Sequence, residues 1–253
     1  MTLFDNERLD YVNDSLSLIQ RTDAVTFGTD ALLLAAYADR RGGRGLELGA
    51  GTGIISLLLL SRGKIDSAVA IEAQADFAEL TRRNTELNGL ADRLLSVNSD
   101  LRFYKSADTY DIVYTNPPYM KADSGKSCAA DSKSIGRHEL LGDIHDFCEA
   151  GKRLVRFGGS FLAVYRPERL AELLSAMREC SIEPKRLTLV HADSASSPSI
   201  VLVEGRRGGK PGMLVTRPLF IYTDGSHTEY SPDMHYINGN GIFPDDFFVK
   251  NKI

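Results

Sequence analysis

The glycine-rich segment from Glu47 to Gly53 constrains the fold more than any other part of the chain. It reads Glu47-Leu48-Gly49-Ala50-Gly51-Thr52-Gly53, with a short apolar stretch before it and an apolar helical run, Gly53–Ser61, after it. In doubly wound α/β sheets, a strand, a glycine turn and a helix in this order bring backbone N–H groups and a helix N-terminus to a ligand. Glycine is needed because the turn adopts unusual dihedral angles and a side chain would hold the ligand away. We therefore expect a ligand site at this turn.

Predicted strands and helices alternate along the rest of the chain. Helices are predicted at Ala31–Ala38, Gln74–Asn88, Ile144–Val155 and Glu168–Glu179, with apolar strands between them. This alternation implies a parallel sheet that helices cover on both faces. The last two predicted strands, Ile200–Glu204 and Met213–Tyr222, flank only Gly205–Gly212, so we expect them to form an antiparallel hairpin at the edge. The predicted fold is a Rossmann-like, doubly wound, seven-stranded mixed sheet.

The length of 253 residues and the composition fit one globular domain, because 43% hydrophobic and 25% charged residues can bury a full core. Within this single domain, residues 1–253, we expect an N-terminal segment and helix (1–43), a core (44–230) and a tail (231–253) without a clear period. The acidic start is unlike a signal peptide, and the longest apolar run, Ala31–Ala38, is too short to span a membrane. Three cysteines without a CxxC pair favour a reduced compartment, and we predict a cytoplasmic protein.

The spacing of the glycines separates two classes of cofactor. The dinucleotide fingerprint G-x-G-x-x-G would place a glycine at position 54, where the chain has Ile54, and this disfavours a nicotinamide oxidoreductase. The glycines follow a G-x-G-x-G pattern instead, after an acidic residue. This pattern resembles the first motif of class I methyltransferases, which use S-adenosylmethionine. The resemblance implies cofactor contacts at Glu47, Gly49, Ala50, Gly51 and Gly53.

Polar residues at the later strand ends extend the expected cofactor site. Glu72 ends the next predicted strand, where a carboxylate can accept hydrogen bonds from both hydroxyls of a ribose. Asp100 follows the third strand, and the resemblance to class I methyltransferases implies that it contacts the adenine amino group of S-adenosylmethionine. Asn116, at the end of the fourth strand, completes the predicted set of cofactor-binding residues.

The fourth strand ends in Asn116-Pro117-Pro118-Tyr119, the most informative stretch for the reaction. Two prolines cannot continue a central strand, so the backbone leaves the sheet at its carboxyl edge, where ligands bind. The tetrapeptide resembles the motif of methyltransferases that act on a planar amine or amide nitrogen. The Asn116 side-chain oxygen and the Pro117 carbonyl can each accept one N–H bond, which stabilises positive charge developing on nitrogen. Tyr119 offers a face for stacking, and we predict that Asn116, Pro117, Pro118 and Tyr119 are catalytic.

Two groups of methyltransferases share this tetrapeptide: those that modify a base amino group in nucleic acid, and those that modify a glutamine amide in release factors. Flanking residues favour the first group, namely Arg8-Leu9-Asp10-Tyr11, Thr26–Ala31, Arg137-His138-Glu139 and Pro184-Lys185-Arg186-Leu187. With them, the chain from about Arg8 to Tyr222 resembles the bacterial tRNA adenine-N6 methyltransferase family. That family modifies the adenine immediately 3′ of the anticodon in a valine tRNA, which implies the tRNA anticodon loop as the partner. Glutamine-amide methylation and a non-catalytic RNA-binding module of the same fold stay as alternatives.

The charge balance places any RNA contact in local clusters. Lys and Arg total 30 against 34 Asp and Glu, a formal net charge of -4, which excludes a uniformly basic surface. Two polar loops carry candidate phosphate contacts: Met120–Glu139, with Lys121, Lys126, Lys133 and Arg137, and the later glycine-rich loop, with Arg206, Arg207 and Lys210. The spacing of His138 and His145 to the cysteines matches no metal site, and we predict that no metal is bound. The oligomeric state stays open.

Overall fold

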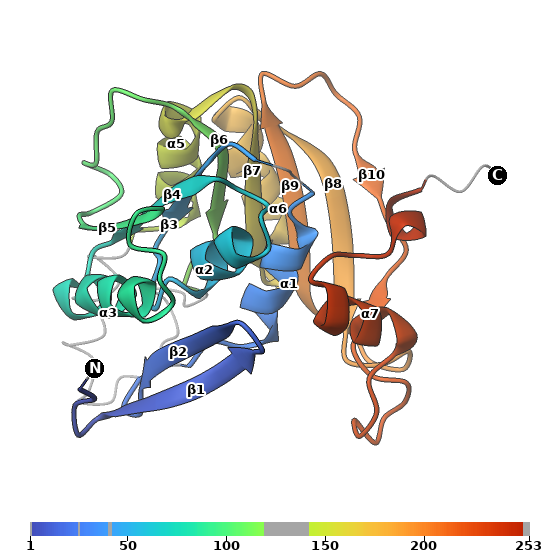
Figure 1. The fold of residues 1–253 in the computed structure, drawn as a ribbon. Coiled ribbons are helices and arrows are strands. Elements are labelled where there is room, and N and C mark those ends of the chain that lie inside the picture. Colours follow the sequence, from blue (N-terminus) through green and yellow to red (C-terminus); the bar gives the residue numbers. More distant parts are fainter. Residues whose placement is uncertain (1, 25, 40–41, 119–141, 250–253) are drawn as a thin grey trace, which may run out of the picture.

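The computed structural model describes residues 2–24, 26–39, 42–118 and 142–249, and the structural statements below concern these residues. The helices are α1 (Thr29–Tyr37), α2 (Ile54–Ser61), α3 (Ala75–Leu87), α5 (Ile144–Leu154), η1 (Pro167–Arg169), α6 (Leu170–Glu179), α7 (Pro232–Asn240) and η2 (Asp245–Phe248). The strands are β1 (Glu7–Asn13), β2 (Leu16–Arg21), β3 (Arg44–Leu48), β4 (Ser67–Glu72), β5 (Leu94–Asn98), β6 (Tyr110–Thr115), β7 (Val155–Tyr165), β8 (Ile182–His191), β9 (Pro198–Arg207), β10 (Leu214–Val215) and β11 (Leu219–Phe220). Figure 1 shows how these elements are arranged.

The large sheet confirms the predicted Rossmann-like mixed sheet. Among the described residues the sheet has nine strands, two more than predicted, because the short strands β10 and β11 pair with β8. The seven long strands lie in the order β5-β4-β3-β6-β7-β9-β8, and β9 is antiparallel to both of its neighbours. The remaining strands from β5 to β7 are parallel, so the carboxyl ends of β3, β4 and β6 meet at one edge. This edge carries the glycine turn and the end of β6, as expected for a ligand site.

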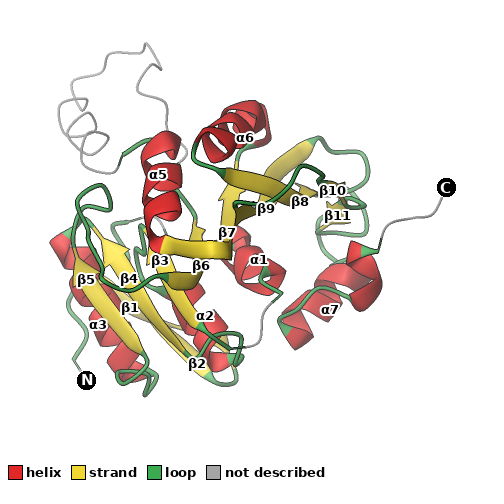
Figure 2. Cartoon of the chain, turned by 90° about the horizontal axis from the view of Figure 1, so that it is seen from above, coloured by secondary structure: helices red, strands yellow, loops and turns green. Residues whose placement is uncertain are grey.

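Helices cover the sheet on both faces (Figure 2). Successive strand residues point to opposite faces, so Ala70 and Ile112 pack with α1 and α2, while Val69 and Val113 pack with α5 and α6. The residues of α2 from Ile54 to Leu60 are all buried, because α2 lies against α1, β2 and the sheet at once. A helix buried on every side has to be apolar all round, which explains the sequence of α2.

An N-terminal hairpin, β1–β2, was not predicted from the sequence. It packs against α3 (Figure 1), where the side chains of Asn84 and Asn88 form hydrogen bonds with the backbone of β2. The Asn84 side chain accepts from the Ile19 nitrogen at 2.7 Å and donates to the Ile19 carbonyl at 3.1 Å. The Asn84 nitrogen also donates to the Thr52 carbonyl at 3.0 Å, so the hairpin is fastened to the glycine turn.

The antiparallel hairpin at the sheet edge is formed by different strands from those expected. β8 pairs with β9, and the predicted strand at Met213–Tyr222 is instead two short strands, β10 and β11, that run parallel to β8. The prediction that the segments around Gly205–Gly212 pair with each other was therefore wrong. The turn that joins the paired strands lies between β8 and β9, where the buried Asp193 accepts from the Ala195 nitrogen at 2.8 Å.

The tail, in which no element was predicted, contains α7 and η2. Ser231 caps α7 by accepting from the Met234 nitrogen at 3.1 Å, and Pro232 occupies the first turn. Met234, Ile237 and Phe243 are buried in the core shared with α1 and α2. The helix was missed because it has only a weak apolar stripe. None of the helices in the described ranges is both long enough and apolar enough to cross a membrane.

Candidate active site

The glycine turn joins β3 to α2 through three residues with positive φ: Gly49 at +71°, Gly51 at +57° and Gly53 at +78°. At Gly53, an added Cβ would lie 2.7 Å from the Thr81 side chain, so close packing against α3 requires glycine. At Gly51, a Cβ would meet nothing within 4 Å, so the backbone there faces open space. This is the position at which a ligand can lie directly against the backbone.

Glu72, at the end of β4, holds the glycine turn in place. Its carboxylate accepts from the Gly51 nitrogen at 2.9 Å and, through its other oxygen, from the Gln74 nitrogen at 2.9 Å. The residue is buried, with 3% of its surface exposed, yet its side chain lines a pocket beside the turn. The carboxylate lies at the end of β4, next to Gly51, and its predicted contact with a ribose stays a prediction.

This pocket, of about 170 Å³, brings together the carboxyl ends of four parallel strands, β3, β4, β5 and β6. Its lining comprises Gly49, Gly51, Ile71, Glu72, Ala73, Gln74, Ser99, Leu101, Asn116, Pro118 and Phe147. The list includes five predicted site residues, and it joins the glycine turn to the Asn-Pro-Pro segment. A mixed apolar and polar lining with one carboxylate suits a nucleoside, whose base is flat and whose ribose carries two hydroxyls.

Glu47 lies beneath the turn and does not line this pocket, contrary to the cofactor contact expected for it. Its carboxyl group is 1% exposed and accepts from the Ser56 nitrogen at 3.0 Å and the Ser56 hydroxyl at 2.5 Å. The same hydroxyl lies 2.7 Å from the Tyr114 hydroxyl. Burial raises the pKa of Glu47 to about 8. The structure therefore places Glu47 where it fastens α2 to β3, because a strand residue two positions before the turn points into the core.

Asp100 forms an ion pair with Arg102. Its carboxylate accepts from the Arg102 guanidinium at 2.5 Å and from the Arg102 backbone nitrogen at 2.9 Å, and this pairing lowers its pKa. Ser99 and Leu101, on either side of it, line the pocket. Ala50 and Gly53 belong to the turn but are also absent from the lining. The contact predicted between Asp100 and an adenine amino group stays a prediction.

Asn116 leaves β6 at the pocket, next to a bond that fixes the strand end. The Thr115 hydroxyl donates to the Leu48 carbonyl at 2.8 Å and ties β6 to β3. The side-chain nitrogen of Asn116 donates to Asp30 in the first turn of α1 at 3.1 Å. Pro117 is buried and Pro118 is exposed at the rim of the pocket. Tyr119, predicted to stack on the substrate, lies outside the described residues.

Sequence reasoning missed several residues of the site, among them Phe147 of the pocket lining and Asp30, which contacts Asn116. Phe147 is 1% exposed and lies beside the turn, 3.4 Å from where a Cβ of Gly49 would be. The apolar face of α5 is visible in the sequence, but nothing in it indicates which residue reaches the pocket. Asp30 belongs to the segment Thr26–Ala31 that carried the family resemblance, but nothing in the sequence indicates that it lies beside Asn116.

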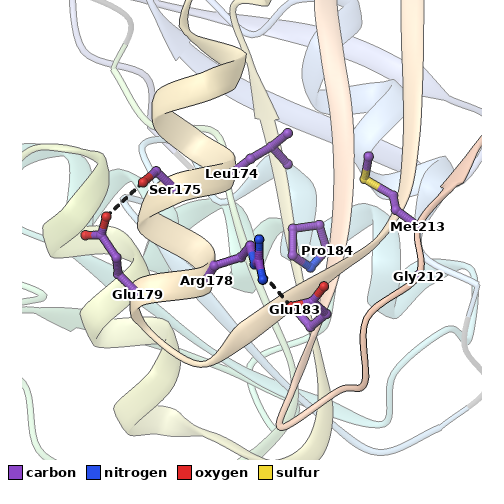
Figure 3. Close-up of a pocket in the computed structure, with 8 residues that line it drawn as sticks. All are labelled: Leu174, Ser175, Arg178, Glu179, Glu183, Pro184, Gly212 and Met213. Carbon is purple, nitrogen blue, oxygen red and sulfur yellow. Dashed lines mark hydrogen bonds and ion pairs between the residues drawn. The ribbon is translucent and has the colours of Figure 1, made fainter.

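The second basic patch predicted for RNA lies at the far edge of the sheet. Arg206 and Arg207 end β9, which runs antiparallel, so they lie roughly 30 Å from its start at the carboxyl edge. A groove of about 640 Å³ is at this far edge too, between α6 and the start of β8 (Figure 3). Arg178 and Glu183 face each other across it at 3.5 Å. Neither feature adjoins Asn116, and the first basic patch, within Met120–Glu139, lies outside the described residues.

Across the described ranges, no three His, Cys, Asp or Glu side chains are grouped as metal ligands would be. His145 lies 3.5 Å from Glu179 and is half exposed, away from the pocket. That no metal takes part stays a prediction.

Solved structures of similar fold include proteins that are named as methyltransferases. A "predicted O-methyltransferase" from Agrobacterium tumefaciens has a TM-score of 0.69 at 23% identity, covering 85% of this chain and 98% of that one. The tRNA m1G37 methyltransferase of M. jannaschii has a TM-score of 0.56 at 15% identity, covering 81% of this chain and 55% of that one. These structures share the fold of this chain, an open mixed sheet with helices on both faces.

Comparison of sequences gives the family. The family model described as "Methyltransferase small domain" matches residues 20–135. Two relatives named tRNA1(Val) (adenine(37)-N6)-methyltransferase are each 30% identical to this chain. The relative from Phocaeicola vulgatus aligns over 181 residues and that from Bacteroides thetaiotaomicron over 182, in each case 71% of this chain and 76% of the relative. The chain belongs to this family of bacterial methyltransferases.

Proposed function

We propose that this enzyme transfers a methyl group from S-adenosylmethionine to the exocyclic N6 of an adenine in tRNA, next to the anticodon. One observation carries the proposal: the glycine turn and Asn116 line the same pocket. A donor held at the turn and an acceptor nitrogen held at Asn116 are then adjacent, and adjacency of the reactants is the main requirement of methyl transfer.

The residues at the turn fit S-adenosylmethionine. Glu72 presents a carboxylate to the ribose hydroxyls, and the open face of Gly51 admits the ligand to the backbone. Ile71, Leu101 and Phe147 supply apolar surface for the flat base. When bound, the cofactor supplies a methyl group on a sulfonium sulfur, which is already activated for transfer. The contact of Asp100 with the adenine amino group remains part of the proposal, whereas Glu47 acts through the fold.

At the acceptor side, Asn116 and Pro117 orient the amino group. The N6 lone pair of adenine is delocalised into the ring, which makes it a poor nucleophile. Two acceptors, the Asn116 side-chain oxygen and the Pro117 carbonyl, each take one N–H bond. They direct the lone pair toward the methyl group and stabilise the positive charge that develops on nitrogen. Tyr119 stacks on the base in this proposal.

The named relatives support tRNA over a protein substrate. Bases of an anticodon loop are unpaired at the start, so one of them enters a pocket without the melting of a long duplex. The overall charge of -4 leaves phosphate contacts to local clusters. A tRNA substrate also supports our proposal that the enzyme is cytoplasmic.

The experiment is a methyl-transfer assay with labelled S-adenosylmethionine and two substrates, unmodified bulk tRNA and a release factor. We expect label in tRNA, with N6-methyladenosine found by mass spectrometry of the digested nucleosides. Label in a glutamine of the release factor would replace the proposed substrate by a protein. Cofactor binding by calorimetry without transfer to either substrate would contradict the reaction itself.

A further inference from the structure

We propose that Asp30 is a positioning residue, which sets the orientation of the Asn116 side-chain amide so that its oxygen meets the target amino group. The inference rests on the proposed function, because it concerns how Asn116 receives its substrate. It assigns a chemical role to the N-terminal segment, which lies outside the glycine turn and the Asn-Pro-Pro-Tyr motif.

The geometry that carries the inference is one hydrogen bond between distant parts of the chain. The Asn116 nitrogen Nδ2 lies 3.1 Å from Asp30 Oδ2, and 86 residues separate the two in sequence. Asp30 lies in the first turn of α1, whereas Asn116 follows the last residue of β6. The fold therefore brings an acidic side chain directly against the predicted catalytic amide.

The direction of this hydrogen bond determines whether the Asn116 amide presents its oxygen or its NH₂ group to a substrate. A carboxylate only accepts hydrogen bonds, so the NH₂ side of the Asn116 amide must face Asp30. The carbonyl oxygen of the amide then points away from Asp30. If the amide were turned by 180°, its NH₂ group would meet the N–H groups of the substrate, donor against donor. Asp30 excludes that orientation, since it would set two acceptor oxygens against each other.

The position of Asp30 is itself fixed by its neighbours. Its other oxygen, Oδ1, accepts from the Ala31 backbone nitrogen at 3.0 Å, so both carboxylate oxygens have defined contacts. An added Cβ on Gly28 would lie 2.9 Å from Oδ1, so glycine at position 28 leaves room for this carboxylate. A negative charge in the first turn of a helix is also stabilised by the helix dipole. The Gly28-Thr29-Asp30 sequence thus places a carboxylate acceptor beside Asn116.

The substitution Asp30→Asn removes the preference for one orientation of the Asn116 amide without changing the size of the side chain at position 30. An amide at position 30 can pair with Asn116 in either orientation, so the oxygen of Asn116 no longer has to face the substrate. We expect kcat to fall about 10- to 100-fold, the range for lost orientation of a reacting group. The cofactor Kd and the KM for tRNA should stay within about 3-fold, because phosphate contacts dominate tRNA binding.

The test compares wild type, Asp30→Asn, Asn116→Ala and the double variant in the tRNA methylation assay, with calorimetry of cofactor binding. If Asp30 acts through Asn116, the double variant has the same kcat as Asn116→Ala within about 2-fold, because the two residues form one unit. Asp76→Asn is the matched control. Asp76 is also in the first turn of a helix, α3, and its side chain is 82% exposed. Losses that multiply in the double variant, or a fall in cofactor affinity with kcat unchanged, would overturn the inference.

Failure of the proposed function is recognised separately, because wild type would then transfer no methyl group to tRNA. In that case the orientation is measured without turnover, from the side-chain amide signals of Asn116 in ¹⁵N-labelled enzyme, assigned with Asn116→Ala. A bond to a carboxylate should shift the Asn116 NH₂ protons and slow their exchange in wild type relative to Asp30→Asn. Identical Asn116 signals in the two proteins would refute the positioning role, whatever the substrate is.

Discussion

The Glu72 carboxylate accepts a hydrogen bond from the Gly51 backbone nitrogen at 2.9 Å, and so links the end of β4 to the glycine turn after β3. One side chain thereby shapes the turn and presents charge to the pocket. Glu72, which we expect to bind the ribose, thus also stabilises the conformation of the glycine turn.

Replacing Glu72 by alanine should weaken cofactor binding about 10- to 100-fold, since hydrogen bonds to a charged group contribute about 1.5–3 kcal/mol. The ribose loses its acceptor and the Gly51 nitrogen loses its partner. Calorimetric titration with S-adenosylmethionine measures the change. Glu79→Ala, which removes an exposed acid of α3 that pairs with Arg82, serves as the control. An unchanged Kd in Glu72→Ala would show that the cofactor lies elsewhere.

Replacing Asn116 by alanine should lower kcat by about 100-fold or more, the usual effect of removing one preorganised hydrogen-bonding group that stabilises transition-state charge. The cofactor Kd should change little, because Glu72 and the turn stay intact. The control is Asn240→Ala, at the exposed end of α7. Activity within a few-fold of wild type would remove Asn116 from the mechanism.

The buried Glu47 should make stability depend on pH. Its pKa is about 8 in the folded state, against an ordinary value of 4.5, so the folded protein binds the extra proton between these values. The contribution of Glu47 to the free energy of unfolding is therefore greatest below pH 4.5, and this contribution falls as the pH rises to about 8. The total change is on the order of 3–5 kcal/mol, at 1.36 kcal/mol for each unit of pKa.

Urea unfolding of wild type and Glu47→Gln at pH 5, 6, 7 and 8 measures this effect. Glutamine has nearly the same shape and does not titrate. As the pH rises from 5 to 8, the unfolding free energy of wild type should therefore fall relative to that of Glu47→Gln. Parallel profiles would mean that Glu47 titrates normally.

The buried Lys64 should be a strong determinant of stability. Its amino group donates to the carbonyls of Ala35, Ala36 and Ala38, at 2.9, 2.8 and 2.7 Å, and so caps the C-terminal end of α1. Burial lowers the pKa of Lys64 to about 7, so the unfolding measurements are made at pH 6, where the group is an ammonium. Lys64→Met keeps the apolar stem but leaves the three carbonyls without this donor. We expect a loss of about 2–4 kcal/mol in the free energy of unfolding, at about 1.5–3 kcal/mol for each bond to a charged group and with partial compensation.

Lys152→Met is the matched control for Lys64→Met, because Lys152 is half-exposed and, among the described residues, pairs with Glu149 at 3.5 Å. Such pairs contribute about 0–1 kcal/mol, so the control should unfold near the wild-type urea midpoint. Equal midpoints for the two variants would contradict the capping role of Lys64.

The central fold was accessible from the sequence because its signals are local. The glycine turn, the apolar strands and the two prolines after Thr115 each determine backbone geometry within a few residues. The pocket followed from topology, since parallel strands that end in Glu72 and Asn116 must end at the same edge.

The remaining features depend on contacts between distant segments. The β1–β2 hairpin completes its hydrogen bonds through Asn84 and Asn88 of α3, and no pattern within residues 7–21 indicates that partner. The strand pairing at the other end of the sheet was predicted wrongly for the same reason. β8 pairs with β9, β10 and β11, and the sequence does not indicate which segments are its partners. The direction of the Glu47 side chain was misjudged because the motif shows its position but not its face of the sheet.

The reversed direction of β9 has a practical consequence for labelling the enzyme. It carries Gly208–Gly212 to the edge opposite the pocket, where Lys185 fastens this loop by donating to the Lys210 and Gly212 carbonyls. A cysteine introduced there and coupled to a fluorophore would sit roughly a strand length from the bound nucleotide. Such a probe would permit immobilisation or single-molecule observation of the enzyme while its catalytic edge stays open to the RNA.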